Sequence, residues 1–196
     1  MGKQVDLLIN YPKAKRNIKA RSISKTEEDR KIAREFGKDF FDGDRKHGYG
    51  GYVYNPIYWS EVVKTFKDYW KLDSNSKVLD IGCGKGFMLY DLQKLIKGIE
   101  IRGVDISKYA IENSIDSIKN YLSVANANNL LFEDNYFDVV ISINTIHNLD
   151  KDQCAKSLQE INRVSKKFSF ITVDAYRNEQ EKKRMFDWNL TAKTIL

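Results

Sequence analysis

The sequence contains very little cysteine, proline and histidine, and it has no long run of apolar residues. Of 196 residues, two are cysteine, two are proline and two are histidine. Two cysteines are too few for a disulfide framework or a cysteine-based zinc cluster, so we expect no metal site and a reducing, cytoplasmic location. No apolar stretch approaches the roughly 18 residues that indicate a membrane span, and the N-terminus lacks the pattern of a signal peptide. These absences favour a globular protein that does not associate with membranes.

Acidic residues are outnumbered by basic ones, 27 to 33, which gives a net charge of +6. Part of the excess is crowded into one short N-terminal segment, at Lys13, Lys15, Arg16, Lys19 and Arg21. A basic run of this kind forms a solvated arm or contacts nucleic acid, and we favour the arm. We interpret residues 1–60 as an arm, a helix and a cap loop, and residues 61–196 as the main domain.

One stretch, residues 77–86, organises the rest of the chain. An apolar run is followed by Gly82, Gly84 and Gly86, and a helical pattern begins at Phe87. A strand, a glycine turn and a helix together present backbone N–H groups to a ligand at the strand's end. The dinucleotide fingerprint G-x-G-x-x-G would need its third glycine at position 87, and no Gly-Lys-Ser/Thr follows for a phosphate loop. A tight turn without any ligand is the remaining structural alternative.

The arrangement D-x-G-x-G-x-G, which begins at Asp80, resembles motif I of the class I S-adenosylmethionine (SAM)-dependent methyltransferases. This resemblance implies an α/β, Rossmann-like, doubly wound and mostly parallel sheet of order 3-2-1-4-5 with an N-terminal helical cap. It also implies SAM as cofactor and S-adenosyl-L-homocysteine (SAH) as product, held at the turn by Asp80, Gly82, Cys83, Gly84 and Gly86. Strands 6 and 7 of the family have no counterpart here. We therefore expect five strands and a far edge that is short or covered, for example in a homodimer.

Further cofactor contacts are expected where the following strands end. Asp105 ends the second strand, 25 residues after Asp80, and an acid at that place accepts hydrogen bonds from ribose hydroxyls in nucleotide-binding βαβ units. It could also cap the next helix. The resemblance extends these contacts to Ile106, to Asn126 and Ala127 at the adenine, and to Asn144 after the fourth strand. Asn126 could instead simply shape a turn.

Candidates for the acceptor side come from an aromatic loop and from two strand ends. Residues 40–55 hold four glycines and three tyrosines, and such loops beside a cofactor site often contact the substrate. The alternative is a glycine loop that its tyrosines pin to the core. His47 and Tyr49 in this loop, with His147 and Asp174 after the fourth and fifth strands, are candidates for a general base or an acceptor anchor. A structural role is an equally good interpretation of His147.

Local patterns also predict the ends of several elements. Ser24 and Glu27 match a capping box, which predicts a helix from there to about residue 36. Further helices are expected from residue 56 or 58 to residue 69 and over residues 107–118, and a third strand over residues 121–127.

The function expected from these residues is methyl transfer from SAM to a small-molecule acceptor. The alternative is a non-catalytic, methyltransferase-like module that binds a nucleotide or RNA. Residues 55–58, Asn-Pro-Ile-Tyr, resemble the N-P-P-Y tetrapeptide of DNA amino-methyltransferases. They lack the second proline and precede motif I, so nucleic acid is the less favoured partner.

Overall fold

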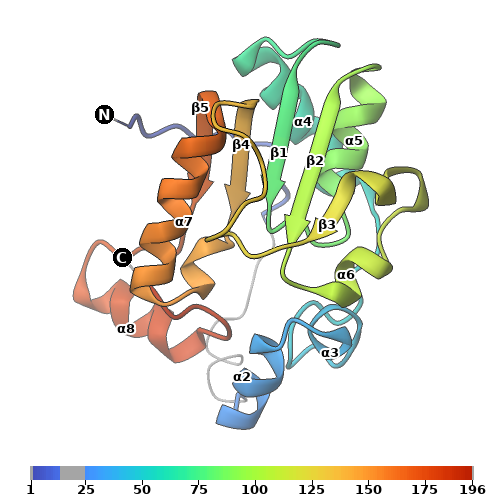
Figure 1. The fold of residues 1–196 in the computed structure, drawn as a ribbon. Coiled ribbons are helices and arrows are strands. Elements are labelled where there is room, and N and C mark those ends of the chain that lie inside the picture. The colour runs from blue at the N-terminus through green and yellow to red at the C-terminus, as the bar shows by residue number, and fades with distance from the viewer. Residues whose placement is uncertain (1, 14–24, 196) are drawn as a thin grey trace.

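The computed structural model describes residues 2–13 and 25–195, and its centre is a five-stranded, all-parallel sheet (Figure 1). The strand order is β3-β2-β1-β4-β5. This confirms the predicted Rossmann-like fold and strand order. The strands are β1 (Lys77–Ile81), β2 (Glu100–Asp105), β3 (Leu122–Val124), β4 (Phe137–Ile143) and β5 (Ser165–Thr172). Because every strand runs the same way, the carboxyl ends of all five strands lie at the same end of the sheet.

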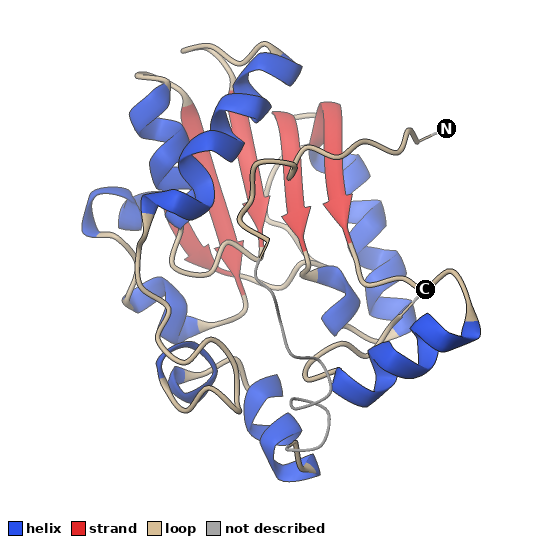
Figure 2. Ribbon diagram, turned by 180° about the vertical axis from the view of Figure 1, so that it is seen from behind, coloured by secondary structure: helices blue, strands red, loops and turns tan. Residues whose placement is uncertain are grey.

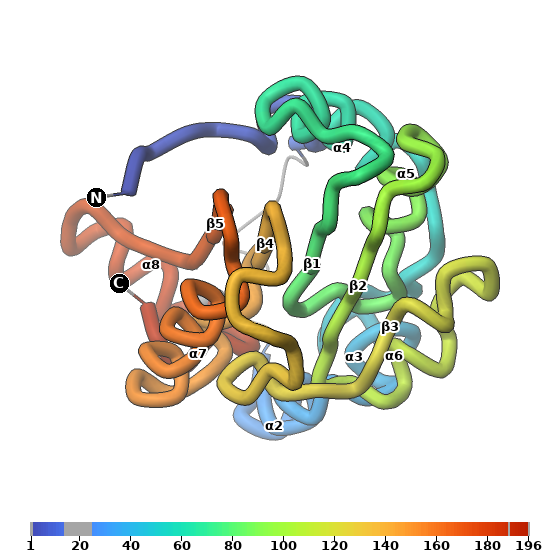
Figure 3. The backbone as a smooth tube through the Cα atoms, turned by 45° about the horizontal axis from the view of Figure 1, so that its top comes forward, coloured from blue at the N-terminus to red at the C-terminus, as the bar shows by residue number. Residues whose placement is uncertain are grey.

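Helices cover both faces of the sheet, as the tube view shows most clearly (Figure 3). On one face lie α4 (Pro56–Trp70) and α5 (Phe87–Leu95), and on the other lies α7 (Lys151–Val164). Each face has its own apolar core, with Val78 in the first and Leu79 in the second. A parallel strand buried on both faces reads as a continuous apolar run, which is why β1 was recognisable in the sequence.

The two longest helices begin at side chains that cap them. The Asn55 side chain accepts a hydrogen bond from the Ile57 N–H, with Pro56 at the first helical position of α4. Asp150 accepts in the same way from the Gln153 N–H at the start of α7. The remaining helix near the C-terminus is α8 (Glu179–Trp188).

The first part of the predicted arm packs against the domain. Residues 2–13 cross the face of the sheet beside α4 (Figure 2), and Leu7 is only 4% exposed within the core. Asn10 Nδ2 donates to Thr65 Oγ1 at 3.0 Å, and the Tyr11 and Trp59 rings lie 5.1 Å apart. The expected division after residue 60 falls inside α4. The basic cluster beyond Lys13 and the predicted cap Ser24 lie outside the described residues.

Residues 25–55 form the cap. Their first helix is α2 (Glu27–Arg34), whose N-terminal capping box differs from the predicted one. The Thr26 hydroxyl accepts from the Asp29 N–H at 3.1 Å, and the Asp29 carboxylate accepts from the Thr26 N–H at 2.8 Å. The backbone bond from Thr26 is the main reason why the pKa of Asp29 is lowered to about 2. A short helix, α3 (Lys38–Asp42), follows.

The helix expected over residues 107–118 is divided into α6 (Lys108–Glu112) and a 3-10 helix, η1 (Asp116–Tyr121). The break lies at two short polar residues whose side chains compete with the helical backbone bonds. Asn113 Nδ2 donates to the Tyr109 carbonyl at 2.8 Å, and Ser114 Oγ donates to the Ile111 carbonyl at 2.7 Å. η1 then takes up Tyr121, so β3 is shorter than the strand expected over residues 121–127.

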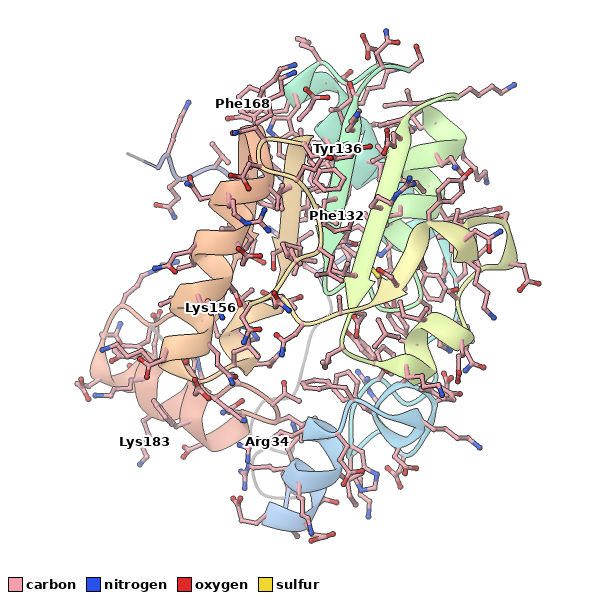
Figure 4. The ribbon with its side chains drawn as sticks, viewed as in Figure 1. Arg34, Phe132, Tyr136, Lys156, Phe168 and Lys183 are labelled. Carbon is pink, nitrogen blue, oxygen red and sulfur yellow. The ribbon has the colours of Figure 1, made fainter. Side chains whose placement is uncertain are left out.

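β5 is one of the two edge strands of the sheet, because within the described part of the chain it pairs with β4 alone. Phe168 on this strand, at the end far from the cap (Figure 4), is 45% exposed. Across residues 2–13 and 25–195, no helix combines the length and the apolar character that crossing a membrane requires.

Candidate functional site

A cavity of about 470 Å³ lies where β1, β2 and β4 end, between the sheet and the cap, by which we mean residues 25–55. A more open hollow of about 590 Å³ lies at the opposite ends of the strands. Several charged groups in that second hollow pair with one another or with a neighbour: Lys77 with Glu100 at 3.7 Å, and Asp138 with Lys167 at 2.9 Å. The first cavity, in contrast, holds a buried and a half-buried acid beside the glycine turn, and it is the candidate site.

The glycine turn is shaped by positive φ angles and close neighbours. Gly82 has φ +83°, and a Cβ there would lie 2.0 Å from Thr145 Oγ1. Gly84 has φ +55°, and its Cβ would lie 3.2 Å from the Tyr52 ring. Both glycines and Cys83 line the cavity. Gly86 lies behind it, where a Cβ would meet Ile118 at 2.5 Å, so this glycine lets α5 pack close to the sheet.

Asp105 lines the cavity and orders the turn at the same time. One carboxylate oxygen accepts from the Gly84 N–H and the other from the Ser107 N–H, both at 2.8 Å. Ser107, and not Asp105, is the N-cap of α6, because its hydroxyl accepts from the Ala110 N–H. Burial raises the pKa of Asp105, and the two backbone bonds oppose that rise. A carboxylate offers about four acceptor positions, which leaves room for hydroxyl donors from a ligand.

Asp80 is the second acid of the cavity. It is 5% exposed, and no described residue donates a hydrogen bond to its carboxyl group. Burial, and to a lesser extent the charge of Asp105, raise the pKa of Asp80 to about 8. A carboxyl group in this setting is costly to ionise unless a cation approaches it. The site therefore suits a ligand with an ammonium or sulfonium group.

One carboxylate ties the cap to the glycine turn. Asp42 at the end of α3 accepts from Lys85 Nζ at 2.6 Å, from the Tyr109 hydroxyl at 2.7 Å and from the Tyr52 N–H at 2.8 Å. Burial acts to raise the pKa of Asp42, but the bonds from Lys85 and Tyr109 outweigh it and lower that pKa. Lys85, in the turn itself, is only 7% exposed. The roof of the cavity is aromatic, with the Tyr49 and Tyr52 rings 4.3 Å apart.

The structure brings most of the predicted site residues to this cavity. Those that line it are Asp80, Gly82, Cys83, Gly84, Asp105, Ile106, Asn126, Ala127, Asn144 and Tyr49. Gly86, His47, His147 and Asp174 are not among the lining residues.

The two histidines make contacts of their own away from the cavity. His147 is 5% exposed, and its Nδ1 accepts a hydrogen bond from the Asp174 N–H at 2.8 Å. The His147 carbonyl accepts another from the Lys193 N–H. Burial lowers the pKa of His147, against the opposing effect of the Asp174 charge. His47 Nε2 lies 3.1 Å from Asp29 Oδ1 in the cap. The catalytic roles expected of His47, His147 and Asp174 stay predictions, and these contacts position the chain.

Two asparagines at the cavity have clear local roles. Asn126 Oδ1 accepts from the Asn128 N–H at 3.2 Å, which matches the alternative in which this residue shapes a turn. Asn144 has φ +52°, a conformation that asparagine tolerates, and its side chain accepts from the Thr172 hydroxyl at 3.0 Å. The exit of β4 is thereby tied to β5.

Several cavity residues were not recognised in the sequence, among them Arg34, Asn148, Lys193, Thr145, Leu8 and Tyr11. None of them belongs to a local motif. Only the position of Arg34, one helical turn after Arg30 on α2, could have suggested a shared helix face.

Comparison with known proteins adds a family and a set of relatives. The family model of a methyltransferase domain matches residues 72–194. A tRNA (carboxymethyluridine(34)-5-O)-methyltransferase of Arabidopsis thaliana is 34% identical over 111 residues, which cover 56% of this chain and 26% of that protein. The mitochondrial arginine-hydroxylase NDUFAF5 of Mus musculus is 34% identical over 89 residues, or 45% of this chain and 25% of that protein. The chain thus spans about a quarter of the length of these curated relatives.

Among solved structures, a protein of Methanococcus maripaludis assigned to the S-adenosyl-L-methionine-dependent methyltransferases matches with a TM-score of 0.52. It is 21% identical, and the match covers 67% of this chain and 64% of that one. At this identity the likeness supports the fold.

Proposed function

Because this chain belongs to the methyltransferase-domain family, we propose that it transfers a methyl group from SAM to a small-molecule acceptor. One observation carries the proposal. A buried acid, Asp80, and a half-buried one, Asp105, face a cavity that is also lined by Gly82 and Gly84 of the glycine turn. An unpaired carboxyl group, a carboxylate that orders the turn, and glycine backbone together fit a ligand with a cationic end and a ribose.

The residues present fit SAM one by one. Asp80 would take the ammonium end, and Gly82 and Gly84 leave room for the ligand to approach the backbone. Asp105 would accept from the ribose hydroxyls beside Ile106, while Asn126 and Ala127 border the adenine end. When bound, SAM supplies an electrophilic methyl group on its sulfonium, and SAH leaves with the carbon–sulfur electron pair.

The chain's own contribution to the rate is alignment and the exclusion of water. The cap closes the cavity with aromatic side chains, which keeps water from the reacting atoms. Tyr49 lines the cavity, so of the catalytic candidates it is the one that would contact an acceptor there. A general base is needed only for an acceptor that arrives protonated, since the methyl group is already activated.

Titration calorimetry with SAM, SAH and NAD tests the cofactor. We expect SAM and SAH to bind in the micromolar range, and Asp105→Ala to weaken both by about tenfold or more, the effect of roughly 1.4 kcal/mol. Asp152→Ala, an exposed acid on α7, is the matched control and should bind as the wild type does. NAD binding without any heat from SAM would refute the proposal.

A transferase assay then separates methyl transfer from mere binding. One curated relative is named for methylation of tRNA and another for hydroxylation of arginine, so transfer must be measured directly. We expect label from methyl-labelled SAM to reach a small-molecule fraction. Salt-dependent RNA binding with no methyl transfer to any small acceptor would support the alternative of an RNA-binding module.

A further inference from the structure

The charges around the cavity are divided between two places. Of the described residues that line it, four carry a formal charge. Asp80 and Asp105 lie at the tips of β1 and β2, whereas Arg34 comes from α2 and Lys193 from the segment after α8. The proposed cofactor accounts for the two acids through its cationic and hydroxyl groups. It leaves open what the two cations bind.

Arg34 is a cation without a partner among the residues that the structure describes. Its Nε is buried and has no hydrogen-bond acceptor, and no described residue forms an ion pair with its guanidinium group. Arg30, one turn earlier on the same helix, has two partners instead: its Nη1 pairs with Glu27, and its Nε donates to the Asn189 carbonyl at 3.1 Å. The Nη groups of Arg34 are not among the buried unpartnered atoms, and no described residue accepts a hydrogen bond from them. They are the donors that a ligand in the cavity can reach.

Contacts among α2, the segment after α8 and η2 bring together the elements that carry Arg34, Lys193 and a third polar group of the cavity. The bond from Arg30 to Asn189 places α2 beside the segment that follows α8. Figure 4 shows Arg34 on the side of α2 that faces α8. The Lys193 N–H donates to the His147 carbonyl at 3.0 Å, within η2 (Ile146–Asn148). The next residue, Asn148, lines the cavity, and its buried Oδ1 has no donor.

We infer that the methyl acceptor carries an anionic group, a carboxylate or a phosphate, which Arg34 and Lys193 hold at this end of the cavity. The inference rests on the proposed function, because it assigns the Asp80–Asp105 end to the cofactor. A guanidinium group matches the geometry of carboxylates and phosphates, with which it forms paired hydrogen bonds. Asn148 completes the polar end by contacting a hydroxyl or amino group next to the anion.

The residues that line the cavity between its acidic end and its cationic end indicate the chemistry of the uncharged part of the acceptor. Phe36, Phe40 and Tyr49 of the cap line the cavity together with Tyr11 and Trp59. Aromatic walls bind apolar or planar groups. The acceptor is therefore a small anionic molecule with an apolar part, and its reactive atom lies nearer the glycine turn than its anionic group does.

Calorimetry on the whole chain saturated with SAH tests this inference with defined probes. Benzoate and phenyl phosphate carry the anion on an apolar ring, and benzamide is the neutral analogue of benzoate. We expect at least one anionic probe to bind about tenfold more tightly than benzamide, and Arg34→Gln to abolish that preference. Lys193→Gln should reduce it, and Arg34→Lys should keep part of it. Lys31→Gln removes an exposed charge from the same helix and should leave the preference unchanged.

Each other outcome overturns one specific claim. If SAH binds but anionic and neutral probes bind alike, or if Arg34→Gln keeps the preference, the anionic-acceptor inference is wrong and the proposed function stands. If Arg34→Gln weakens SAH but not methylthioadenosine, which lacks the amino acid carboxylate, Arg34 belongs to the cofactor and the inference fails. If neither SAM nor SAH binds the wild type, the proposed function itself fails.

Discussion

The glycine turn and the cap border the same cavity, but they are held in place in different ways. The turn is fixed by backbone: Gly82 and Cys83 both donate to the Val104 carbonyl, and Asp105 accepts from Gly84. The cap is fixed by a few side chains, with Asp42 contacting Lys85 and Tyr109 of the main domain. Backbone bonds between neighbouring strands survive most substitutions, whereas a link through one carboxylate depends on that residue alone.

The difference indicates how the two regions divide the work. A rigid turn can present the same surface to a cofactor in every turnover. A cap held by side-chain links can be altered to suit an acceptor without disturbing the sheet. The following substitutions test this division, beginning with the largest expected effect on cofactor affinity.

Gly82→Ala should weaken cofactor binding more than any of the other substitutions. The added Cβ would lie 2.0 Å from Thr145 Oγ1, and alanine is strained at φ +83°. We expect SAH affinity to fall on the order of a hundredfold by calorimetry. Gly98→Ala is the control: this glycine has φ +91°, but its Cβ would meet only Ser74, outside the cavity.

That control should lose about 1 kcal/mol of stability and bind SAH normally. If Gly82→Ala does not fold, Thr145→Gly added to it relieves the clash and allows the binding measurement. Normal SAH binding by a folded Gly82→Ala variant would show that the turn does not approach the ligand.

Asp80 should make SAM binding depend on pH. Its pKa of about 8 in the free protein means that it is mostly protonated at neutral pH, and an ammonium group would require the ionised form. SAM affinity should therefore rise by up to tenfold per pH unit from about pH 6 to about pH 8, with release of a proton. Calorimetry in buffers of different ionisation enthalpy measures that proton. Asp80→Asn should bind more weakly, without the pH dependence, and a pH-independent wild type would contradict the assignment.

The raised pKa of Asp80 should also make the stability of the ligand-free protein depend on pH. The folded pKa of Asp80 lies above its unfolded value, so its contribution to stability is complete at low pH. It is lost progressively as pH rises from about 4 to about 8. Urea unfolding of the wild type and Asp80→Asn across this range should show the difference between them changing in that direction.

Asp42→Asn should loosen the cap more than the turn. The substitution leaves the buried Lys85 ammonium without its carboxylate, so we expect a loss of roughly 1–3 kcal/mol in stability. SAH affinity should fall by less than about tenfold, because the backbone bonds of the turn remain. Limited proteolysis should show faster cleavage within residues 43–55. Asp39→Asn, an exposed acid on the same helix, is the control, and equal protection of both variants would show that Asp42 does not hold the cap.

Thr26→Ala should have the smallest effect on the cofactor. It removes the hydroxyl that caps α2, at a cost of about 1 kcal/mol in stability. SAH binding should be unchanged, because α2 borders the other end of the cavity. Thr26→Ser keeps the hydroxyl and should behave as the wild type does. A marked loss of SAH affinity in Thr26→Ala would mean that α2 supports the cofactor end as well.

The strands and the glycine turn were predictable because their signals are local. β1 is an apolar run that ends in Asp80 and three glycines, and Asp105 closes the next run. The boundaries of the helices were less predictable. Asn113 and Ser114 end α6 through side-chain hydrogen bonds, which the spacing of apolar residues does not reveal. The predicted capping box paired Ser24 with Glu27, whereas the observed one pairs Thr26 with Asp29. Both acids stand three residues after a hydroxyl residue, so the sequence fits either pair.

The residues that depend on tertiary contacts could not be predicted in this way. Residues 2–13 have no periodic pattern, yet Leu7 is buried because the sheet face beside α4 lies open to it. His147 follows β4 as the resemblance suggested, but its ring turns to the Asp174 N–H behind the cavity. Both outcomes were decided by which surfaces remained unfilled once the sheet had formed.

The sequence alone determined the strands and the glycine turn, because each is encoded by a run of neighbouring residues, and the resemblance to the methyltransferases implied the strand order. Only the tertiary structure decided which residues form the end of the cavity that carries the cations. Arg34, Asn148 and Lys193 are far apart in the chain, and α2, η2 and the segment after α8 bring them to one cavity. Whether the charge of Arg34 is paired depends on which residues surround it in the folded protein, and residues that are distant in the sequence determine those surroundings.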